Sequence, residues 1–281
     1  MPSSRSASPI SPRSDEPALA PAWRALARKA GLAPWLVAQA IATRRRAAVL
    51  PEAGGARAGV VGGASQGVRH DVCDAGAPSL RLLVAGDSSA AGVGVADQSD
   101  AVAGHLTRAL HRELGRPVEW TLRARSGLDT RAVHALLRGD PPPAADVAVV
   151  ITGVNDVTSQ VGARRAVAHR RALADWLLVE GLARHVVFAP LPPLHRFPLL
   201  PEPLRRVLGD DARRHDLALA RWAATCGNVS HLAIALDLHA GVMASDGFHP
   251  GAPVYRACGE ALAAHVAGIA RAKADGWALR G

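Results

Sequence analysis

Short apolar runs alternate with longer stretches of helical periodicity from residue 80 to near the C-terminus, and this alternation constrains the fold more than any other feature. The apolar runs, each bounded by Gly, Pro or polar residues, are residues 80–85, 118–122, 147–151 and 185–189. The helical patterns cover residues 102–114, 130–137, 165–182, 211–224 and 254–273. Continuously apolar strands separated by helices predict an α/β fold whose parallel sheet is covered on both faces. In such folds, functional sites lie beyond the carboxyl ends of the strands.

The first predicted strand leads into a loop of small residues, Gly86-Asp87-Ser88-Ser89-Ala90-Ala91-Gly92. We expect Ser88 to lie at a strand-to-helix turn, where helix N–H groups stabilise a developing oxyanion. A Gly-rich turn with a capping Ser and a phosphate cradle are the alternatives for this loop. A P-loop is excluded because no Gly-Lys-Ser/Thr follows, and the GxGxxG pattern of dinucleotide-binding proteins is not completed.

The second and third predicted strands are also followed by turn-forming and polar residues. Gly127 stands after the second strand, and Gly153-Val154-Asn155-Asp156 follows the third. Taken singly, Gly127 is a permissive turn residue and Asn155 a helix cap. Because the carboxyl ends of parallel strands share one edge of a sheet, we expect Ser88, Gly127 and Asn155 to converge there.

A fourth segment, Asp246-Gly247-Phe248-His249-Pro250, precedes the last helical pattern. The chain has 12 His, so a chance D-x-x-H pattern with a structural or surface His is the alternative reading. Gly247 and Pro250 keep the segment out of a helix. An Asp three residues before a His on a tight loop orients the imidazole, which then accepts a proton from a serine.

In order and spacing, Gly86-Asp87-Ser88, Gly127, Gly153-Val154-Asn155-Asp156 and Asp246-Gly247-Phe248-His249 resemble the four blocks of the SGNH (GDSL-like) esterase and acylhydrolase family. The resemblance covers about residues 80–270. It implies a three-layer α/β/α flavodoxin-like fold with a central parallel sheet. Two features depart from the family pattern: Ser89 replaces the Leu that often follows the nucleophile, and the first 78 residues have no counterpart in the minimal domain.

The resemblance implies a catalytic triad. Ser88 is the expected nucleophile, His249 is the general base and then the general acid, and Asp246 fixes the tautomer of the imidazole.

The resemblance also implies an oxyanion hole, formed by the backbone N–H groups of Ser88 and Gly127 and the side-chain amide of Asn155. Asp87 and Asp156 are expected to support the loops through hydrogen bonds. No metal or organic cofactor is required by this chemistry.

The predicted function is hydrolysis of carboxylic esters through an acyl-enzyme. Acyl transfer to an alcohol or sugar is a second reading, because the same intermediate can be resolved by an acceptor other than water. A binding protein on the same fold is the third. The expected partner is a small-molecule ester, and the residues indicate neither its acyl chain nor its alcohol, nor an oligomeric state. The Pro- and Leu-rich residues 191–208 are expected to wall the substrate pocket or to form a plain crossover.

The N-terminal part differs in composition from the predicted catalytic domain at residues 79–281. Residues 1–20 are rich in Ser and Pro and are expected to be disordered. Residues 21–78 are expected to form a helical extension and, at residues 54–67, a Gly-rich linker. We expect the helix to dock on the catalytic domain because Pro34 interrupts its amphipathic face; contact with an anionic membrane surface is the alternative.

Charge and cysteine content exclude several classes of function. The net charge is +9, but residues 81–281 carry 23 basic against 19 acidic residues and aromatic content is only 4%, which disfavours nucleic-acid binding. The 3 Cys form no CxxC pair, so no disulfide framework or structural zinc site is indicated, and His70 with Cys73 is an isolated H-x-x-C. Arg pairs such as Arg170-Arg171 are interpreted as solvated helix faces. With no signal-peptide pattern, we expect a cytoplasmic protein that could contact a membrane surface through residues 23–50.

Overall fold

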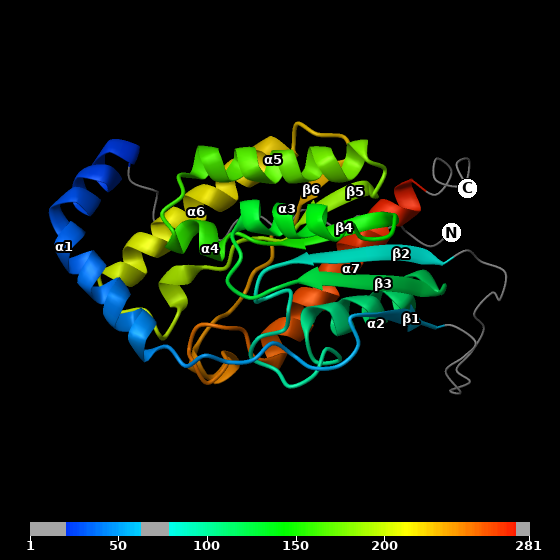
Figure 1. The fold of residues 1–281 in the computed structure, drawn as a ribbon, viewed down its shortest axis with the longest axis horizontal. Helices are drawn as coiled ribbons and strands as arrows, with labels where there is room; N and C mark the ends of the chain where they lie inside the picture. The colour runs from blue at the N-terminus through cyan, green and yellow to red at the C-terminus, as the bar shows by residue number, and fades with distance from the viewer. Residues whose placement is uncertain (1–20, 63–78, 274–281) are drawn as a thin grey trace, which may run out of the picture.

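This computed structural model describes residues 21–62 and 79–273, and their strands form one six-stranded sheet (Figure 1). The strands are β1 (Ala58–Val61), β2 (Leu80–Gly86), β3 (Val118–Ala124), β4 (Ala145–Ile151), β5 (Ala183–Phe188) and β6 (Val229–His231). Their order is β1-β3-β2-β4-β5-β6, and each neighbouring pair is parallel except β1 with β3. Apart from β1, this is the flavodoxin-like order, in which the chain leaves β2 first to one side and then to the other.

The four predicted strands correspond to β2, β3, β4 and β5, with boundaries shifted by at most two residues. Nearly all residues of β2 and β4 are buried, as expected for apolar runs covered on both faces of a sheet. Strands β1 and β6 are not predicted from the sequence. Both are short, and β1 lies among glycines, so neither produces a clear apolar run.

Helices cover both faces of the sheet (Figure 1). On one face α2 (Val102–Leu114) packs against α7 (Ala252–Ala272). The other face carries α3 (Thr130–Gly139), α5 (Ala163–Val179) and α6 (Leu204–Ala223). A short α4 (Val154–Thr158) and two 3₁₀ turns, η1 (Leu194–Arg196) and η2 (Ala240–Val242), lie in the connections. The expected three-layer α/β/α fold is confirmed.

The N-terminal helix α1 spans Ala22–Arg46 and lies beside α6 (Figure 1). It continues through Pro34, so this proline does not end the helix. Arg28 and Lys29 on α1 form ion pairs with Asp210 and Asp211 on α6, each at 2.5 Å. These ion pairs, together with Leu36, which packs against the core, fix the helix to the rest of the molecule.

Residues 51–62 differ from the expected linker, because part of this segment joins the sheet. Ala53 is buried, and the backbone of Gly54 exchanges hydrogen bonds with the loop that follows β2, through the carbonyl of Ala96 and the N–H of Gln98. β1 then pairs with β3 in an antiparallel register. The outer edge of β3 carries backbone N–H and C=O groups that β2 does not reach. β1 supplies partners for them through its own backbone, and such bonds depend little on the side chains of the added strand.

Several expectations fall outside the described residues. These are the disorder expected for residues 1–20, the rest of the Gly-rich linker, and the His70 and Cys73 pair. Among the helices in the described ranges, none combines the length and the apolar character that crossing a membrane requires.

Candidate active site

Three loops that follow β3, β2 and β4 lie side by side at the carboxyl edge of the sheet. Because β2 pairs with β3 on one side and β4 on the other, Gly86 stands in register with Ala124 and Ile151. A Cβ atom at Gly86 would collide with the carbonyl oxygen of Ile151, so only glycine allows the strands to approach this closely before the loops diverge. The loop that carries Ser88 is thereby placed between the loops that carry Gly127 and Asn155.

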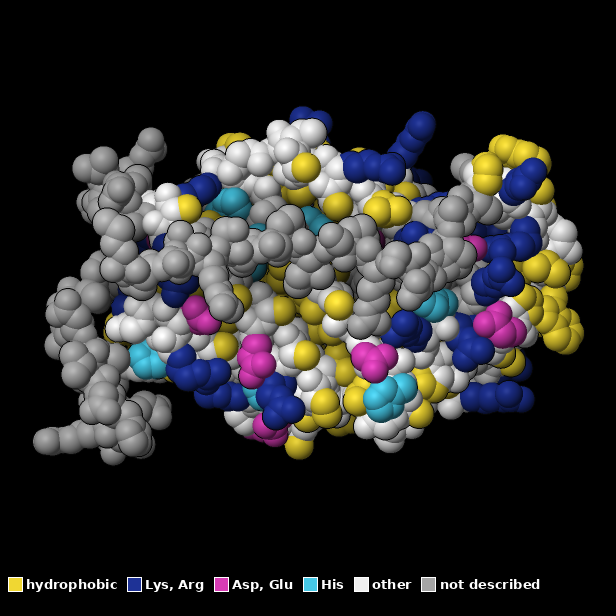
Figure 2. Space-filling view, turned by 180° about the vertical axis from the view of Figure 1, so that it is seen from behind, with side chains coloured by type: hydrophobic (Ala, Val, Ile, Leu, Met, Phe, Trp, Pro, Cys, Tyr) yellow, Lys and Arg dark blue, Asp and Glu magenta, His cyan; other side chains and the backbone are white. Residues whose placement is uncertain are grey.

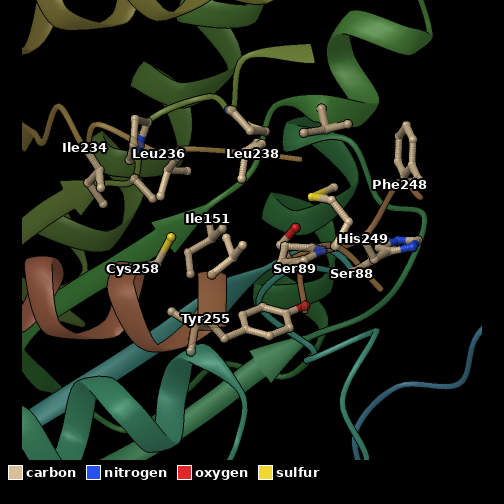
Figure 3. A pocket seen from close by; sticks show the side chains of 18 of the residues that line it. Ser88, Ser89, Ile151, Ile234, Leu236, Leu238, Phe248, His249, Tyr255 and Cys258 are labelled. Carbon is tan, nitrogen blue, oxygen red and sulfur yellow. Dashed lines mark hydrogen bonds between the residues drawn. The ribbon is translucent and has the colours of Figure 1, made fainter. Parts of the chain in front are cut away.

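Ser88, His249 and Asp246 form a continuous chain of hydrogen bonds, although Ser88 and the other two lie 161 and 158 residues apart in sequence. The distance from Ser88 Oγ to His249 Nε2 is 3.0 Å, and Nδ1 of the same ring lies 2.5 Å from Asp246 Oδ2. Figure 3 shows Ser88 and His249 next to each other at one end of a pocket. When Nδ1–H donates to the carboxylate, Nε2 is left as the acceptor for the serine hydroxyl. This arrangement can activate a serine as a nucleophile.

The Asp246 carboxylate is held by its own loop. Its Oδ1 accepts hydrogen bonds from the backbone N–H groups of Phe248 and His249, both at 2.9 Å. Burial raises the pKa of Asp246, but the hydrogen bonds from the His249 side chain and from these two N–H groups outweigh it, so the pKa lies below its usual value. Asp246 is therefore a carboxylate at neutral pH and can stabilise a positive charge on the imidazole.

The loop after Ser88 differs from the expected strand-to-helix turn. The chain makes a series of turns there, with hydrogen bonds from Ala91 N–H to Asp87 O and from Val93 N–H to Ser88 O, and α2 begins only at Val102. Ser88 thus follows a strand but does not stand at the N-terminus of a helix. Any donors for an oxyanion must come from the loop itself and from its neighbours.

The two other expected oxyanion-hole residues lie on the flanking loops. Gly127 has a φ of 81°, a left-handed conformation that a glycine adopts without strain. The Nδ2 of Asn155 donates to the carbonyl oxygen of Leu128 at 2.9 Å and so connects the loop after β4 with the loop after β3. An amide nitrogen carries two hydrogens, and this bond uses one of them. Asn155 can therefore hold the Gly127 loop and still donate to a ligand.

Asp87 and Asp156 both hold backbone or side-chain groups of these loops. Asp87 is buried and accepts a hydrogen bond from the N–H of Ser89 at 3.0 Å; its burial raises its pKa to about 7. Asp156 is fully buried and accepts two hydrogen bonds from Thr130, one from its side-chain hydroxyl at 2.6 Å and one from its backbone N–H at 3.3 Å. Both carboxyl groups therefore accept hydrogen bonds from residues at the start of the structures that follow β2 and β3.

Arg170 contradicts the interpretation of the Arg170-Arg171 pair as a solvated face. Its side chain is completely buried, and its Nη2 lies 3.8 Å from Asp156 Oδ2. Arg171 is exposed and pairs with Asp175. The signal was present in the helical spacing, because Arg170 shares one face of α5 with buried residues. These neighbours on the buried face are Ala166, Leu173, Ala174 and Leu177.

A second contact that the sequence analysis missed comes from the N-terminal extension. Glu52 Oε1 accepts a hydrogen bond from the N–H of Ser126, next to Gly127, at 2.6 Å. Glu52 Oε2 pairs with Arg57 at 2.8 Å, and Arg57 donates to the carbonyl oxygen of Ala124 at 2.9 Å. Residues 52–57 therefore fix the start of the loop after β3. No local pattern reveals this, because the partners lie about 70 residues apart.

An apolar pocket extends from Ser88 into the molecule, between the loop after β5, the segment before η2 and helix α7. In Figure 3 Ser88 and His249 lie toward one end, and Ile234 and Cys258 lie toward the other. The wall includes Phe197, so residues 191–208 do contribute to it, but Leu199 is not among the lining residues. Burial raises the pKa of Cys258 to about 12, so this residue presents a neutral thiol to the pocket.

Comparison with known proteins identifies the family of the chain. The profile of the GDSL-like Lipase/Acylhydrolase family matches residues 84–257. The GDSL-like esterase Rv1075c of Mycobacterium tuberculosis is 30% identical over 196 residues, which span 65% of this chain and 60% of that protein. This chain thus covers less than two thirds of the length of that relative.

Two solved structures share the fold at low sequence identity. The lipase Lip_vut3 from a goat rumen metagenome superposes with a TM-score of 0.54 at 18% identity, covering 68% of this chain and 98% of the lipase. A carbohydrate esterase family 3 enzyme from Talaromyces cellulolyticus gives 0.50 at 12% identity, with coverages of 68% and 98%. The profile match includes the Ser88, Gly127 and Asp246-to-His249 segments and more than half of the chain. The chain belongs to the GDSL-like lipase/acylhydrolase family, whose enzymes hydrolyse ester bonds.

Proposed function

We propose that this chain is a serine esterase that cleaves carboxylic esters through an acyl-enzyme on Ser88. The observation that carries the proposal is the 3.0 Å distance between Ser88 Oγ and His249 Nε2, with Asp246 on the opposite side of the imidazole. His249 takes the hydroxyl proton as Ser88 Oγ attacks the ester carbonyl. The imidazolium, stabilised by Asp246, then donates that proton to the leaving alcohol.

Deacylation repeats the same steps with water as the nucleophile. His249 removes a proton from the water, the hydroxide attacks the acyl carbon, and the proton returns to Ser88 as the carboxylic acid leaves. In both steps a tetrahedral intermediate carries a negative oxygen. We assign its stabilisation to the N–H groups of Ser88 and Gly127 and to Asn155 Nδ2, each worth about 3 to 4 kcal/mol in the transition state.

We infer that the acyl group carries an apolar chain. The pocket starts at the proposed nucleophile, and most of its wall is aliphatic or aromatic. An alkyl chain placed there gains about 0.8 kcal/mol for each buried CH₂ group, whereas a polar acyl group would lose hydrogen bonds to water. The aromatic ring of Phe197 contacts that of Phe248, the neighbour of His249, edge to face, with 5.2 Å between the ring centres. The chain would therefore pass close to this pair.

Labelling with a fluorophosphonate tests the nucleophile. The full chain should be labelled on one serine, Ser88→Ala should abolish labelling, and the neighbouring Ser89→Ala should retain it. Labelling of a folded Ser88→Ala protein, or loss of labelling in Ser89→Ala alone, would assign the nucleophile elsewhere. Adding an alcohol acceptor and measuring the acid and ester products separates hydrolysis from acyl transfer.

A series of nitrophenyl esters of increasing chain length tests the pocket. Phe197→Ala should change the kcat/KM of the longer esters more than that of the acetate, because Phe197 lines the pocket. Leu199→Ala is the matched control, since Leu199 lies in the same segment but outside the lining. Equal effects of both substitutions on all esters would contradict an acyl-binding role for this pocket.

A further inference from the structure

Helix α1 presents most of its large apolar side chains to solvent instead of to the rest of the protein. Its inward side is formed by Ala25, which is buried, and by half-buried residues that include Leu32 and Leu36. The charged side chains of Arg28 and Lys29 also face inward, toward the aspartates of α6. A helix that only packs on a globular domain would bury its large apolar side chains and expose the charges.

The outward side of α1 forms an apolar stripe. Of the nine large hydrophobic residues that are exposed in the described part of the chain, five lie on this helix. Four of them, Trp23 (67% exposed), Leu26 (69%), Val37 (56%) and Ile41 (48%), share one side of the helix and form the stripe, while Trp35 (60%) is exposed on its flank. Figure 2 shows hydrophobic side chains gathered beside Lys and Arg side chains at one end of the molecule, where α1 lies in Figure 1.

Every ionisable side chain in α1 is basic. The helix contains no Asp or Glu, and four arginines, Arg24, Arg44, Arg45 and Arg46, are exposed at its two ends. The Arg24 guanidinium lies 5.2 Å from the centre of the Trp23 ring. Tryptophans with arginines at the ends of an apolar stripe are the pattern of helices that lie in the interface between a lipid bilayer and water.

Charge decides between the possible occupants of this surface. A second copy of the chain would bring the same arginines together, and their repulsion disfavours self-association through α1. An anionic lipid surface attracts them and at the same time takes up the apolar stripe. We propose that α1 attaches the protein reversibly to anionic membrane surfaces, lying parallel to the bilayer plane. The proposal concerns attachment alone and does not depend on the esterase chemistry.

Co-sedimentation of the full chain with vesicles provides the test. One set of vesicles contains phosphatidylcholine alone, and a second set contains about one third phosphatidylglycerol. The full chain should bind the anionic vesicles more strongly and should be released by added salt, because salt screens the arginines. Failure of the full chain to bind the anionic vesicles would overturn the proposal.

Two sets of variants locate the contact. Arg44→Gln, Arg45→Gln and Arg46→Gln together should weaken binding on the order of a hundredfold, about fivefold for each charge. Leu26→Gln, Val37→Gln and Ile41→Gln together should weaken it about tenfold or more. The matched controls are Arg138→Gln with Arg164→Gln and Arg165→Gln, and Val179→Gln, all exposed on α3 and α5. Their binding should change much less than that of the α1 variants.

The outcomes against the proposal are distinct. If control and α1 variants lose binding equally, the attraction comes from the overall charge, and α1 is not the docking surface. If sedimentation equilibrium shows a dimer that the Leu26, Val37 and Ile41 variants abolish, the stripe is a self-association surface, and the proposal is wrong. Circular dichroism and unchanged turnover of a soluble acetate ester verify that each variant is folded.

Discussion

Replacing Asp246 by Asn would change one atom of the proposed triad and leave the loop around it intact. The wild-type Oδ1 accepts two backbone N–H bonds at 2.9 Å, while Oδ2 faces Nδ1 of His249. An asparagine keeps both backbone bonds only if its carbonyl oxygen takes the position of Oδ1. Its NH₂ group then faces Nδ1, which must become an acceptor, so the ring proton moves to Nε2 and points at Ser88.

The magnitudes decide which orientation the amide adopts. The reversed amide would lose two backbone hydrogen bonds and leave both N–H groups facing another donor, at a cost of about 2 to 6 kcal/mol. The orientation that preserves these bonds is therefore favoured, and it leaves His249 unable to accept the serine proton. We expect kcat/KM for a nitrophenyl ester to fall about 10³- to 10⁴-fold, equivalent to roughly 4 to 5.5 kcal/mol; the upper figure is that of the chymotrypsin triad.

The assay compares kcat/KM of Asp246→Asn with that of the wild type and of Asp175→Asn, an exposed aspartate on α5. Thermal unfolding followed by circular dichroism should give a similar midpoint for all three proteins. A folded Asp246→Asn enzyme that retains more than about a tenth of the wild-type kcat/KM would refute the tautomer argument.

Three further predictions concern the loops at the site and the N-terminal extension. Asn155→Ala should lower kcat about a hundredfold with little change in KM, because the oxyanion exists only in the transition state; a loss below about threefold would exclude Asn155 from the hole. Burial raises the pKa of Asp87 from 3.8 to about 7, so the folded state binds this proton more tightly than the unfolded chain, and the stability due to this group falls as the pH rises through that range. Urea unfolding at about pH 5 and pH 8 should therefore show the wild type losing about 2.5 kcal/mol relative to Asp87→Asn, and parallel pH curves would contradict the raised pKa. Deleting residues 1–50 should leave acetate-ester turnover within about twofold of the wild-type value. Glu52→Ala in the full chain should lower this turnover about tenfold, because it releases Ser126 and the loop beside it. Equal turnover of Glu52→Ala and the wild type would show that the loop holds its position without Glu52.

The central layers of the fold could be predicted because their residues carry local signals. The runs that became β2 and β4 are apolar enough to be recognised without partners, and the helices between them have a clear period. β1 and β6 have no such signal, since four and three residues acquire their strand conformation only from the neighbouring strand. The start of α6 was predicted at residue 211, but the helix begins at Leu204. Pro203 directly precedes it, and a proline is compatible with the start of a helix.

The residues of the candidate site also fall into those that carry a local sequence signal and those that do not. Ser88, His249 and Asp246 lie in short motifs whose order was recognisable, and the structure brings the three together. Arg170 and Glu52 belong to no motif, and their contacts depend on tertiary packing. The turn after Ser88 was misjudged because small residues are compatible both with a helix N-terminus and with successive turns.

The antiparallel strand β1 covers the edge of the sheet that β3 would otherwise expose. β3 is bonded to β2 on one side, and its other side is occupied by Ala58–Val61. A chain shortened to begin at residue 79 would leave those backbone groups of β3 exposed to solvent, and an unpaired strand readily accepts a strand from another molecule. The opposite side of the sheet ends in β6, whose three residues offer a much shorter template. The extension therefore contributes to solubility: the shortened chain should form intermolecular β-sheet aggregates at concentrations at which the full-length protein stays dispersed.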